Sequence, residues 1–145
     1  MFEKYTEKAR RVIFFARYEA GEFGSNSIET EHLLLGLLRE DRALVSSLLP
    51  ANVSMESLRA RIEAQVERKE KIMTSVELRL SDESREVLIY AAEESNNLRH
   101  SHIGPEHLLL GLLHVTDSLA EKVLRENGVN SSTVRQQIDG SAGDV

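Results

Sequence analysis

The apolar residues of this chain recur with the 3.6-residue period of an α-helix. Between residues 6 and 24, one side of such a helix collects the apolar side chains of Ala9, Val12, Ile13, Ala16, Ala20 and Phe23. Thr6 is placed to cap the beginning of this helix and Gly24 to end it. Residues 81–98 repeat the pattern, with Ser81 as the cap. No convincing run of alternating apolar and polar residues is found, so the pattern predicts an all-α protein without strands.

The following helix is apolar nearly all round. In the first half of the chain it begins at Thr30, which we expect to be its cap, and it contains the letters EHLLLGLL from Glu31 to Leu38. The same eight letters return 75 residues later, from Glu106 to Leu113, after Gly104-Pro105. Proline suits a first helical turn because its φ angle is fixed at a helical value. The chain is therefore a tandem duplication of one small helical unit.

A helix without a polar face has to be buried on most sides, so the two copies are expected to form the centre of the molecule. Gly36 and Gly111 interrupt the leucines at equivalent positions. Each costs about 1 kcal/mol in helix propensity, which indicates that a neighbouring helix approaches closely there.

Shorter helical patterns complete each copy, so the sequence predicts two tandem four-helix repeats in one compact domain at residues 1–140. The shorter helices are expected at about 42–49, 54–68, 117–126 and 131–139. The predicted divisions are repeat one at about 2–68, a charged and then small and polar connector at about 69–80, repeat two at about 81–140, and a tail of linker composition at 141–145.

Composition and net charge argue against several classes of functional site and partner. The 145 residues are 41% hydrophobic and 29% charged, which suffices for one core. With no cysteine there is no disulfide framework, thiolate nucleophile or cysteine-bound metal, and the net charge of −6 argues against nucleic acid as a partner. Without a signal-peptide or membrane-span pattern, we expect a cytoplasmic protein that does not bind membranes, and an isolated domain that is monomeric.

No catalytic pattern is found, so we expect neither an enzyme nor a cofactor. The phosphate-binding and nucleophile-elbow motifs are missing. His100 and His102 lie near His107, but the first copy has Ser25 and Ser27 at the matching places. Histidines that pack against a helix start and bond to the backbone explain this pattern better than a metal site. An enzyme that uses a metal on the histidine-rich loop is a third and weaker hypothesis.

The start of each central helix is the most suggestive place for a ligand. The first amide groups of a helix are unpaired and carry the positive end of the dipole, so anions bind there. Glu31 and Glu106 add a carboxylate beside these amides. Such a pairing suits a ligand with one anionic part and one guanidinium or amine part. The alternative is that each glutamate only complements its own helix dipole.

Phe14 and Tyr18 project from the first helix on the side opposite its apolar stripe, where the second copy has Ile89 and Glu93. An exposed aromatic pair can mark a protein-docking surface. Packing between the two copies is the alternative explanation.

The segments Thr6–Val12 and Ile28–Leu38, with their second appearance at Ser81–Val87 and Ile103–Leu113, closely resemble the double Clp N-terminal repeat. This is the substrate- and adaptor-binding domain of Clp-type AAA+ unfoldases, and the resemblance to the ClpC branch is strongest. It covers about Phe2 to Gly140.

The resemblance implies two four-helix repeats related by pseudo-twofold symmetry, tethered above an ATPase ring that lies in the same chain or in a partner. It also implies partners among adaptor proteins and protein substrates. In some members the Thr-Glu-His motif binds phosphoarginine through its glutamate. This places the ligand sites at Glu31 and Glu106, flanked by the remaining motif residues Thr30, His32 and His107.

Two positions depart from the family pattern. Glu29 replaces the usual glycine and adds negative charge where a phosphate would approach, and Pro105 replaces the usual threonine and removes a hydroxyl and an amide donor. The expected function is a non-catalytic module that captures adaptors or tagged substrates. The alternative is a free-standing accessory protein that docks on a Clp machine and modulates it.

Overall fold

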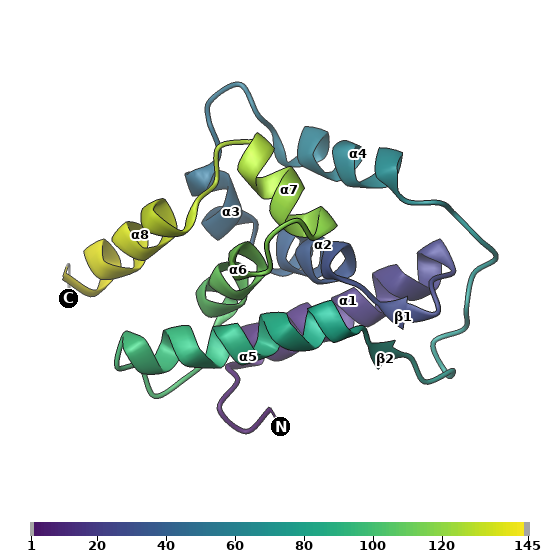
Figure 1. Ribbon diagram of the computed structural model, residues 1–145, viewed down its shortest axis with the longest axis horizontal. Helices are drawn as coiled ribbons and strands as arrows, with labels where there is room; N and C mark the ends of the chain where they lie inside the picture. Colours follow the sequence, from purple (N-terminus) through teal and green to yellow (C-terminus); the bar gives the residue numbers. More distant parts are fainter. Residues whose placement is uncertain (1, 144–145) are drawn as a thin grey trace.

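The computed structural model describes residues 2–143, and side-chain environments through residue 139. Its helices form two groups of four, which confirms the all-α tandem repeat (Figure 1). The first group contains α1 (Glu7–Phe23), α2 (Thr30–Glu40), α3 (Arg42–Leu48) and α4 (Met55–Gln65). The second contains α5 (Asp82–Asn97), α6 (Pro105–His114), α7 (Leu119–Glu126) and α8 (Ser131–Gly143).

The first helix of each repeat begins at its predicted cap. The Thr6 hydroxyl accepts the Ala9 N–H at 3.1 Å, and the Ser81 hydroxyl accepts the Ser84 N–H at 3.1 Å. Gly24 ends α1 with a φ of 70°, a left-handed conformation that glycine adopts without steric cost.

The prediction that Thr30 caps α2 is wrong by one residue. Glu29 is the N-cap, and Thr30 is the first helical residue, as Pro105 is in α6. The Thr30 hydroxyl is committed elsewhere, because it accepts the Ala120 N–H at the start of α7 at 3.4 Å. A contact between residues 90 positions apart therefore decided a feature that looked local.

Two other boundaries differ from expectation. Helix α4 ends at Gln65 rather than near residue 68. Helix α8 continues through Gly143, so residues 141–143 of the predicted linker are helical, and residues 144–145 lie outside the described part. No proline interrupts α8, and a glycine costs a helix only about 1 kcal/mol.

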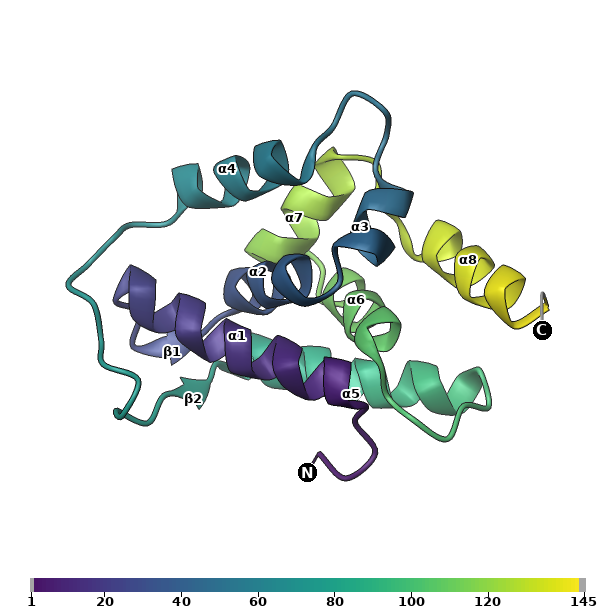
Figure 2. The same ribbon diagram turned by 180° about the vertical axis from the view of Figure 1, so that it is seen from behind.

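Helices α2 and α6 form the centre of the molecule, as predicted, with the other helices arranged around them (Figures 1 and 2). Their leucines are almost completely buried, at 0% exposure for Leu34, Leu35, Leu37, Leu109 and Leu110. A Cβ atom added at Gly36 would lie 2.9 Å from the Ala16 nitrogen of α1, and one at Gly111 would lie 3.2 Å from the Ala91 nitrogen of α5. Both glycines therefore permit the close helix approach that the sequence predicted.

Two short parallel strands were not predicted. Strand β1 (Ser27–Ile28) pairs with β2 (Arg79–Leu80), so that Ile28 lies opposite Leu80. An isolated parallel bridge joins Tyr5 to Ile103. Each pairing is too short to leave an alternating pattern in the sequence.

These pairings are reciprocal between the repeats. The Ser81 N–H donates to the Ile28 oxygen at 3.0 Å, and the Thr6 N–H donates to the Ile103 oxygen at 3.0 Å. Ser81 and Ile103 are the copies of Thr6 and Ile28 at the 75-residue offset. Contacts that exchange in this way are those of a twofold axis, so the repeats are related by pseudo-twofold symmetry.

A buried carboxylate joins the first and last helices of each repeat. In repeat one, Arg59 of α4 donates to both oxygens of Glu19, at 3.0 and 2.9 Å. In repeat two, Arg135 of α8 donates to both oxygens of Glu94, at 3.2 and 2.5 Å, and His114 also contacts Glu94 at 2.8 Å. The glutamates are 1% and 4% exposed, and these pairs satisfy their charge.

The connector between the repeats passes along α1 and is held there by backbone contacts (Figure 2). The Lys69 and Ile72 N–H groups donate to carbonyl oxygens near the end of α1 at 2.9 Å each. The Arg17 guanidinium donates to the carbonyl oxygens of Met73 and Val76 at 2.8 and 2.5 Å. This segment is therefore tied to repeat one, although its composition is that of a linker.

Candidate functional site

The five predicted ligand residues divide into buried and accessible groups. Thr30, His32 and His107 are 2%, 1% and 0% exposed, whereas Glu31 and Glu106 are half-buried at the surface. Only the two glutamates are therefore placed to touch a ligand directly. The assignment of these residues to a ligand site stays a prediction.

The two buried histidines organise the helix starts. His32 Nδ1 accepts the Glu29 N–H at 2.9 Å, and His107 Nδ1 accepts the Gly104 N–H at 2.9 Å. Each ring thus satisfies a backbone donor just before the helix, which a capping side chain usually does. This duplicated contact explains the histidine of the repeated EHLLLGLL segment without a ligand.

Burial keeps both rings from taking up a second proton. Burial lowers the pKa of His32 to about 4. Burial, together with the nearby His100 and His102, lowers the pKa of His107 to about 4. Both rings are therefore neutral at pH 7, and because Nδ1 is an acceptor, the proton of each is on Nε2.

The repeats use this Nε2 proton differently. His107 Nε2 lies 2.8 Å from His100 Nδ1 and donates to it. His32 Nε2 is buried without a hydrogen-bond partner, and Ser25, at the position that matches His100, bonds instead to the Ser27 carbonyl oxygen at 2.7 Å. The two helix starts therefore share their capping geometry and differ in what surrounds it.

Glu31 lies beside an open cavity of about 330 Å³. Most of the charged residues that line it are acidic: Glu29, Glu31 and Glu67 are carboxylates, and Lys69 is a cation. Burial chiefly raises the pKa of the Glu31 carboxyl, and the negative charges of Glu29 and Glu83 act in the same direction. This environment favours a cationic group and opposes a second anion.

Glu106 lies in a different setting. Its Oε1 is 3.7 Å from His102 Nε2 and 3.2 Å from His107 Nδ1. The second distance is no ion pair, because His107 is neutral and its Nδ1 already accepts a hydrogen bond. Pro105 supplies no amide N–H at this helix start. The pairing of a carboxylate with free amides is therefore weaker here than the sequence suggested.

The structure also collects a histidine cluster that sequence reasoning underrated. One ring nitrogen each of His100, His102 and His107 lie within 4.8 Å of one another. The sequence placed the first two on one loop near His107, but the first copy has Ser25 and Ser27 at the matching places, so a metal site was the weaker interpretation. His107 joins them because the loop folds back over the start of α6. In the sequence, the cluster was indicated only by the short distance along the chain from His100 and His102 to His107.

The predicted docking residues lie on an exposed surface of α1. Phe14 is 68% exposed and Tyr18 is 37% exposed, so the alternative that they pack between the repeats is wrong. The connector adds Met73, 73% exposed, and Val76, 48% exposed. These four residues form what we call the α1–connector surface.

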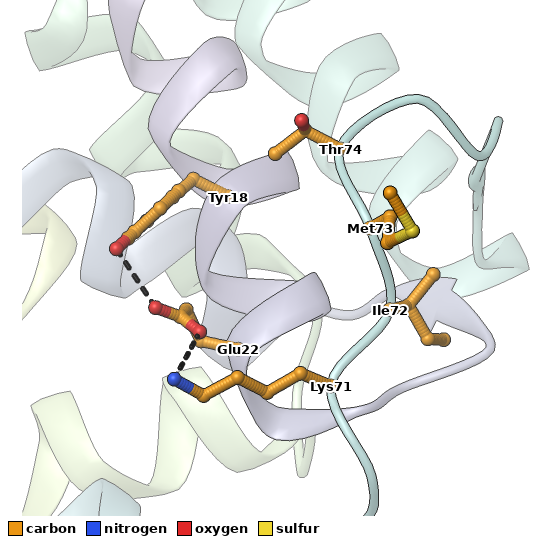
Figure 3. Close-up of a pocket in the computed structure, with 6 residues that line it drawn as sticks. All are labelled: Tyr18, Glu22, Lys71, Ile72, Met73 and Thr74. Carbon is orange, nitrogen blue, oxygen red and sulfur yellow. Dashed lines mark hydrogen bonds and ion pairs between the residues drawn. The ribbon is translucent and has the colours of Figure 1, made fainter.

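A cavity of about 250 Å³ opens beside this surface, between Tyr18 and the connector (Figure 3). The Tyr18 hydroxyl donates to Glu22 at 2.8 Å, and Lys71 pairs with Glu22 at 3.2 Å. Polar contacts thus border an apolar surface, as in many protein interfaces.

Within residues 2–143, no helix is both long and apolar enough to cross a membrane.

Comparison with known proteins identifies the relatives of this chain. Residues 4–83 and 79–144 match the family model "Clp repeat (R) N-terminal domain". The chain is 36% identical over 139 residues to the chloroplastic ClpA homolog of Brassica napus, an ATP-binding subunit of Clp protease. It is 34% identical over 139 residues to the negative regulator of genetic competence ClpC/MecB of Bacillus subtilis. Each match covers 95% of this chain but only 16% and 17% of the relatives.

Solved structures agree with the sequence matches. The N-terminal domain of ClpD from Arabidopsis thaliana superposes with a TM-score of 0.72 at 29% identity, covering 92% of this chain and 91% of that one. The N-terminal domain of Hsp104 from Candida albicans has the same fold, with a TM-score of 0.73 at 20% identity, covering 93% of this chain and 89% of that one. The chain belongs to the family of Clp repeat N-terminal domains.

Proposed function

We propose that this chain is a non-catalytic recognition domain that captures adaptor proteins or protein substrates for a Clp-type AAA+ unfoldase. The observation that carries the proposal is the pair of Clp repeats, which together span nearly the whole chain. The curated relatives include ATP-binding subunits of Clp protease, and this chain corresponds to about one sixth of their length. Binding and tethering to the machine would raise the local concentration of a client without new contacts.

The accessible carboxylates of Glu31 and Glu106 are the groups best placed to hold a client side chain. A carboxylate accepts two parallel hydrogen bonds from a guanidinium group, which selects arginine in a fixed orientation. The start of α2 behind Glu31 keeps the Thr30 amide as a donor for an anion, so the guanidinium and phosphate of phosphoarginine match the two parts there. The shared chemistry is an arginine side chain, with or without its phosphate.

The two sites are not expected to treat the phosphate alike. At Glu31 the surrounding carboxylates of Glu29 and Glu67 repel it, although Thr30 keeps its amide. At Glu106 there is less acidic charge, but Pro105 has no amide to donate. Arginine recognition is therefore better supported than phosphoarginine recognition at Glu31.

The test is calorimetric titration of arginine and phosphoarginine peptides into the parent protein and into Glu31→Ala and Glu106→Ala. Loss of a bidentate, charge-assisted contact is expected to weaken binding by roughly tenfold in each variant, about 1.4 kcal/mol, while helicity is unchanged. Glu126→Ala, which removes an exposed carboxylate of α7, is the control. Equal affinities in all four proteins would remove the site assignment, and comparison of the two peptides separates arginine from its phosphorylated form.

The α1–connector surface supports a second contact with a folded adaptor. Phe14 is its most prominent aromatic residue, and exposed aromatic side chains dominate the binding energy of many interfaces. The copy of Phe14 in repeat two is Ile89, which is 58% exposed. Both positions thus face solvent, in agreement with the pseudo-twofold symmetry. Only the position on α1 carries an aromatic ring.

A further inference from the structure

The loop between α5 and α6 brings two histidines next to the first turn of α6. Its backbone is held by α5 and by the N-terminal segment. The His100 N–H donates to the Ser95 carbonyl oxygen at 2.9 Å, and the Ser95 hydroxyl donates to the His102 carbonyl oxygen at 2.5 Å. The Ile103 N–H then donates to the Lys4 carbonyl oxygen at 2.9 Å. The two imidazoles are therefore carried on an anchored backbone rather than on a free loop.

Ring nitrogens of His100, His102 and His107 lie there within 4.8 Å of one another, but the three rings differ in their ability to bind a metal ion. His107 uses Nδ1 to accept the Gly104 N–H, so its Nε2 carries a proton and is a donor, not a ligand. Metal-bound histidines show the opposite arrangement, in which the second nitrogen donates a proton. His107 is therefore a capping residue that borders the cluster.

His100, in contrast to His107, has a ring nitrogen that can bind a metal ion. Its Nδ1 accepts the His107 Nε2 proton at 2.8 Å, so Nδ1 presents a lone pair toward the cluster. Moving this lone pair to a metal ion would leave His107 Nε2 without a partner. Repeat one already has that condition at His32, whose Nε2 is buried and unpartnered. The fold thus tolerates a capping histidine without this bond.

The carboxylate of Glu106 lies close to His102 and offers an oxygen atom as a further ligand. Its Oε1 is 3.7 Å from His102 Nε2. Ligand atoms of a tetrahedral zinc site are roughly 3.4 Å apart, because each lies about 2.0–2.1 Å from the ion. The His102 side chain is 49% exposed and the Glu106 side chain 28%, so both can rotate to close the remaining gap.

We propose that His100, His102 and Glu106 form a binding site for a divalent transition-metal ion of the zinc type at the start of α6. Two imidazoles and one carboxylate are a ligand set that such ions prefer, and Mg²⁺ and Ca²⁺ prefer oxygen ligands alone. The site belongs to repeat two, because repeat one has Ser25, Ser27 and Glu31 at the same three positions. It shares Glu106 with the proposed client site, so a bound ion and an arginine side chain would compete for this carboxylate, whereas His100 and His102 serve the metal site alone.

The test is titration of Zn²⁺ into the metal-free protein at pH 7.5 by calorimetry, with Mg²⁺ titrated in parallel. One zinc ion per chain is expected, and no Mg²⁺. The double variant His100→Ser/His102→Ser reproduces the residues of repeat one and is expected to lower zinc affinity by more than about 100-fold. Glu106→Gln is expected to lower it about tenfold, whereas the matched variant Glu31→Gln is expected to leave it unchanged.

Circular dichroism of each variant shows that loss of binding does not come from unfolding. Nitrogen-15 NMR of the histidine rings gives a second readout. His100 and His102 are expected to shift on zinc addition, while His107 keeps its proton on Nε2. The proposal is overturned if zinc does not bind, if the double variant binds it equally well, if Glu106→Gln has no effect, or if His107 becomes the ligand.

Discussion

One buried histidine in each repeat has two structural roles. His32 and His107 fill space at the centre of the fold and accept the last backbone N–H before α2 and α6, at 2.9 Å each. An imidazole does both only while it is neutral, because a protonated Nδ1 would confront the backbone N–H. Burial of each ring lowers its pKa to about 4, which keeps it in the neutral form that this contact needs.

The free energy of unfolding is therefore expected to fall with acid. An unfolded histidine takes up a proton near pH 6.5, whereas the folded rings resist until about pH 4, so stability is complete above pH 6.5 and is lost between these values. Lowering the pH from 7.5 to 5.0 is expected to cost about 2 kcal/mol per ring. Urea denaturation across this range measures the effect.

His32→Asn is the matched variant, because its amide oxygen can still accept the Glu29 N–H and does not titrate. It should lose about half of the pH dependence. Glu31 acts in the opposite sense, since its raised pKa favours the folded state in acid, and comparison with the parent at each pH removes that contribution. An unchanged slope in the variant would refute the role of His32.

At the scale of helices, the fold depends on how closely α2 approaches α1 and α6 approaches α5. Gly36 leaves no room for a side chain, because a Cβ atom would meet the Val12 carbonyl oxygen and the Ala16 nitrogen of α1. Gly111 has the same relation to Val87 of α5. The obstructing atoms are backbone, which cannot rotate away as a side chain can. The outer helices α4 and α8 are then fixed by the buried glutamate–arginine pairs.

Gly36→Ala is expected to destabilise the protein by about 1–3 kcal/mol. In an exposed helix the same change would stabilise by up to about 1 kcal/mol, because alanine is the better helix former. The opposite sign follows from the clash with α1. Chemical denaturation of Gly36→Ala measures this loss, and Ser46→Ala, at an exposed position of α3, is the control for introducing alanine into a helix without a clash. A stabilised Gly36→Ala protein would contradict the close packing of α1 and α2.

At the scale of the whole molecule, the two repeats are halves of one core. Helices α2 and α6 contact each other, and the strand and bridge pairings cross from each repeat to the other. Each repeat alone would expose the central helix that its partner covers. A unit of about 60–70 residues buries too little surface to compensate for that loss.

An isolated repeat, residues 1–68, is therefore not expected to fold as a monomer. It should either lack a cooperative thermal transition or form a twofold dimer that imitates the missing repeat. Circular dichroism with analytical ultracentrifugation distinguishes these outcomes from a folded monomer. A monomeric fragment with a cooperative transition would show that the repeats are independent domains.

Periodicity and local chemistry predicted most of the fold correctly. The caps Thr6 and Ser81, the end at Gly24 and the close approach at Gly36 all follow from residues within one or two helical turns. The cap of α2 was misassigned, because the Thr30 hydroxyl is recruited by α7, 90 residues away. The strands were missed because two residues leave no pattern.

The candidate sites were less predictable. The sequence placed Glu31 and Glu106 correctly in the first helical turn. It also predicted histidines that pack against the helix start and bond to the backbone, which is confirmed for His32 and His107. It did not show that Thr30 is buried beside them. It placed His100 and His102 near His107 but did not show that the three rings meet, and it did not group Glu106 with them.

By itself, the sequence determined that the protein is helical, duplicated and built around two leucine-rich helices, because helix formation and burial depend on residues three or four positions apart. Only the tertiary structure decided which polar groups reach solvent and which meet one another. Those properties depend on segments that are far apart along the chain and adjacent in space, such as Thr30 beside the start of α7 and the connector along α1. A periodic pattern carries no record of such contacts.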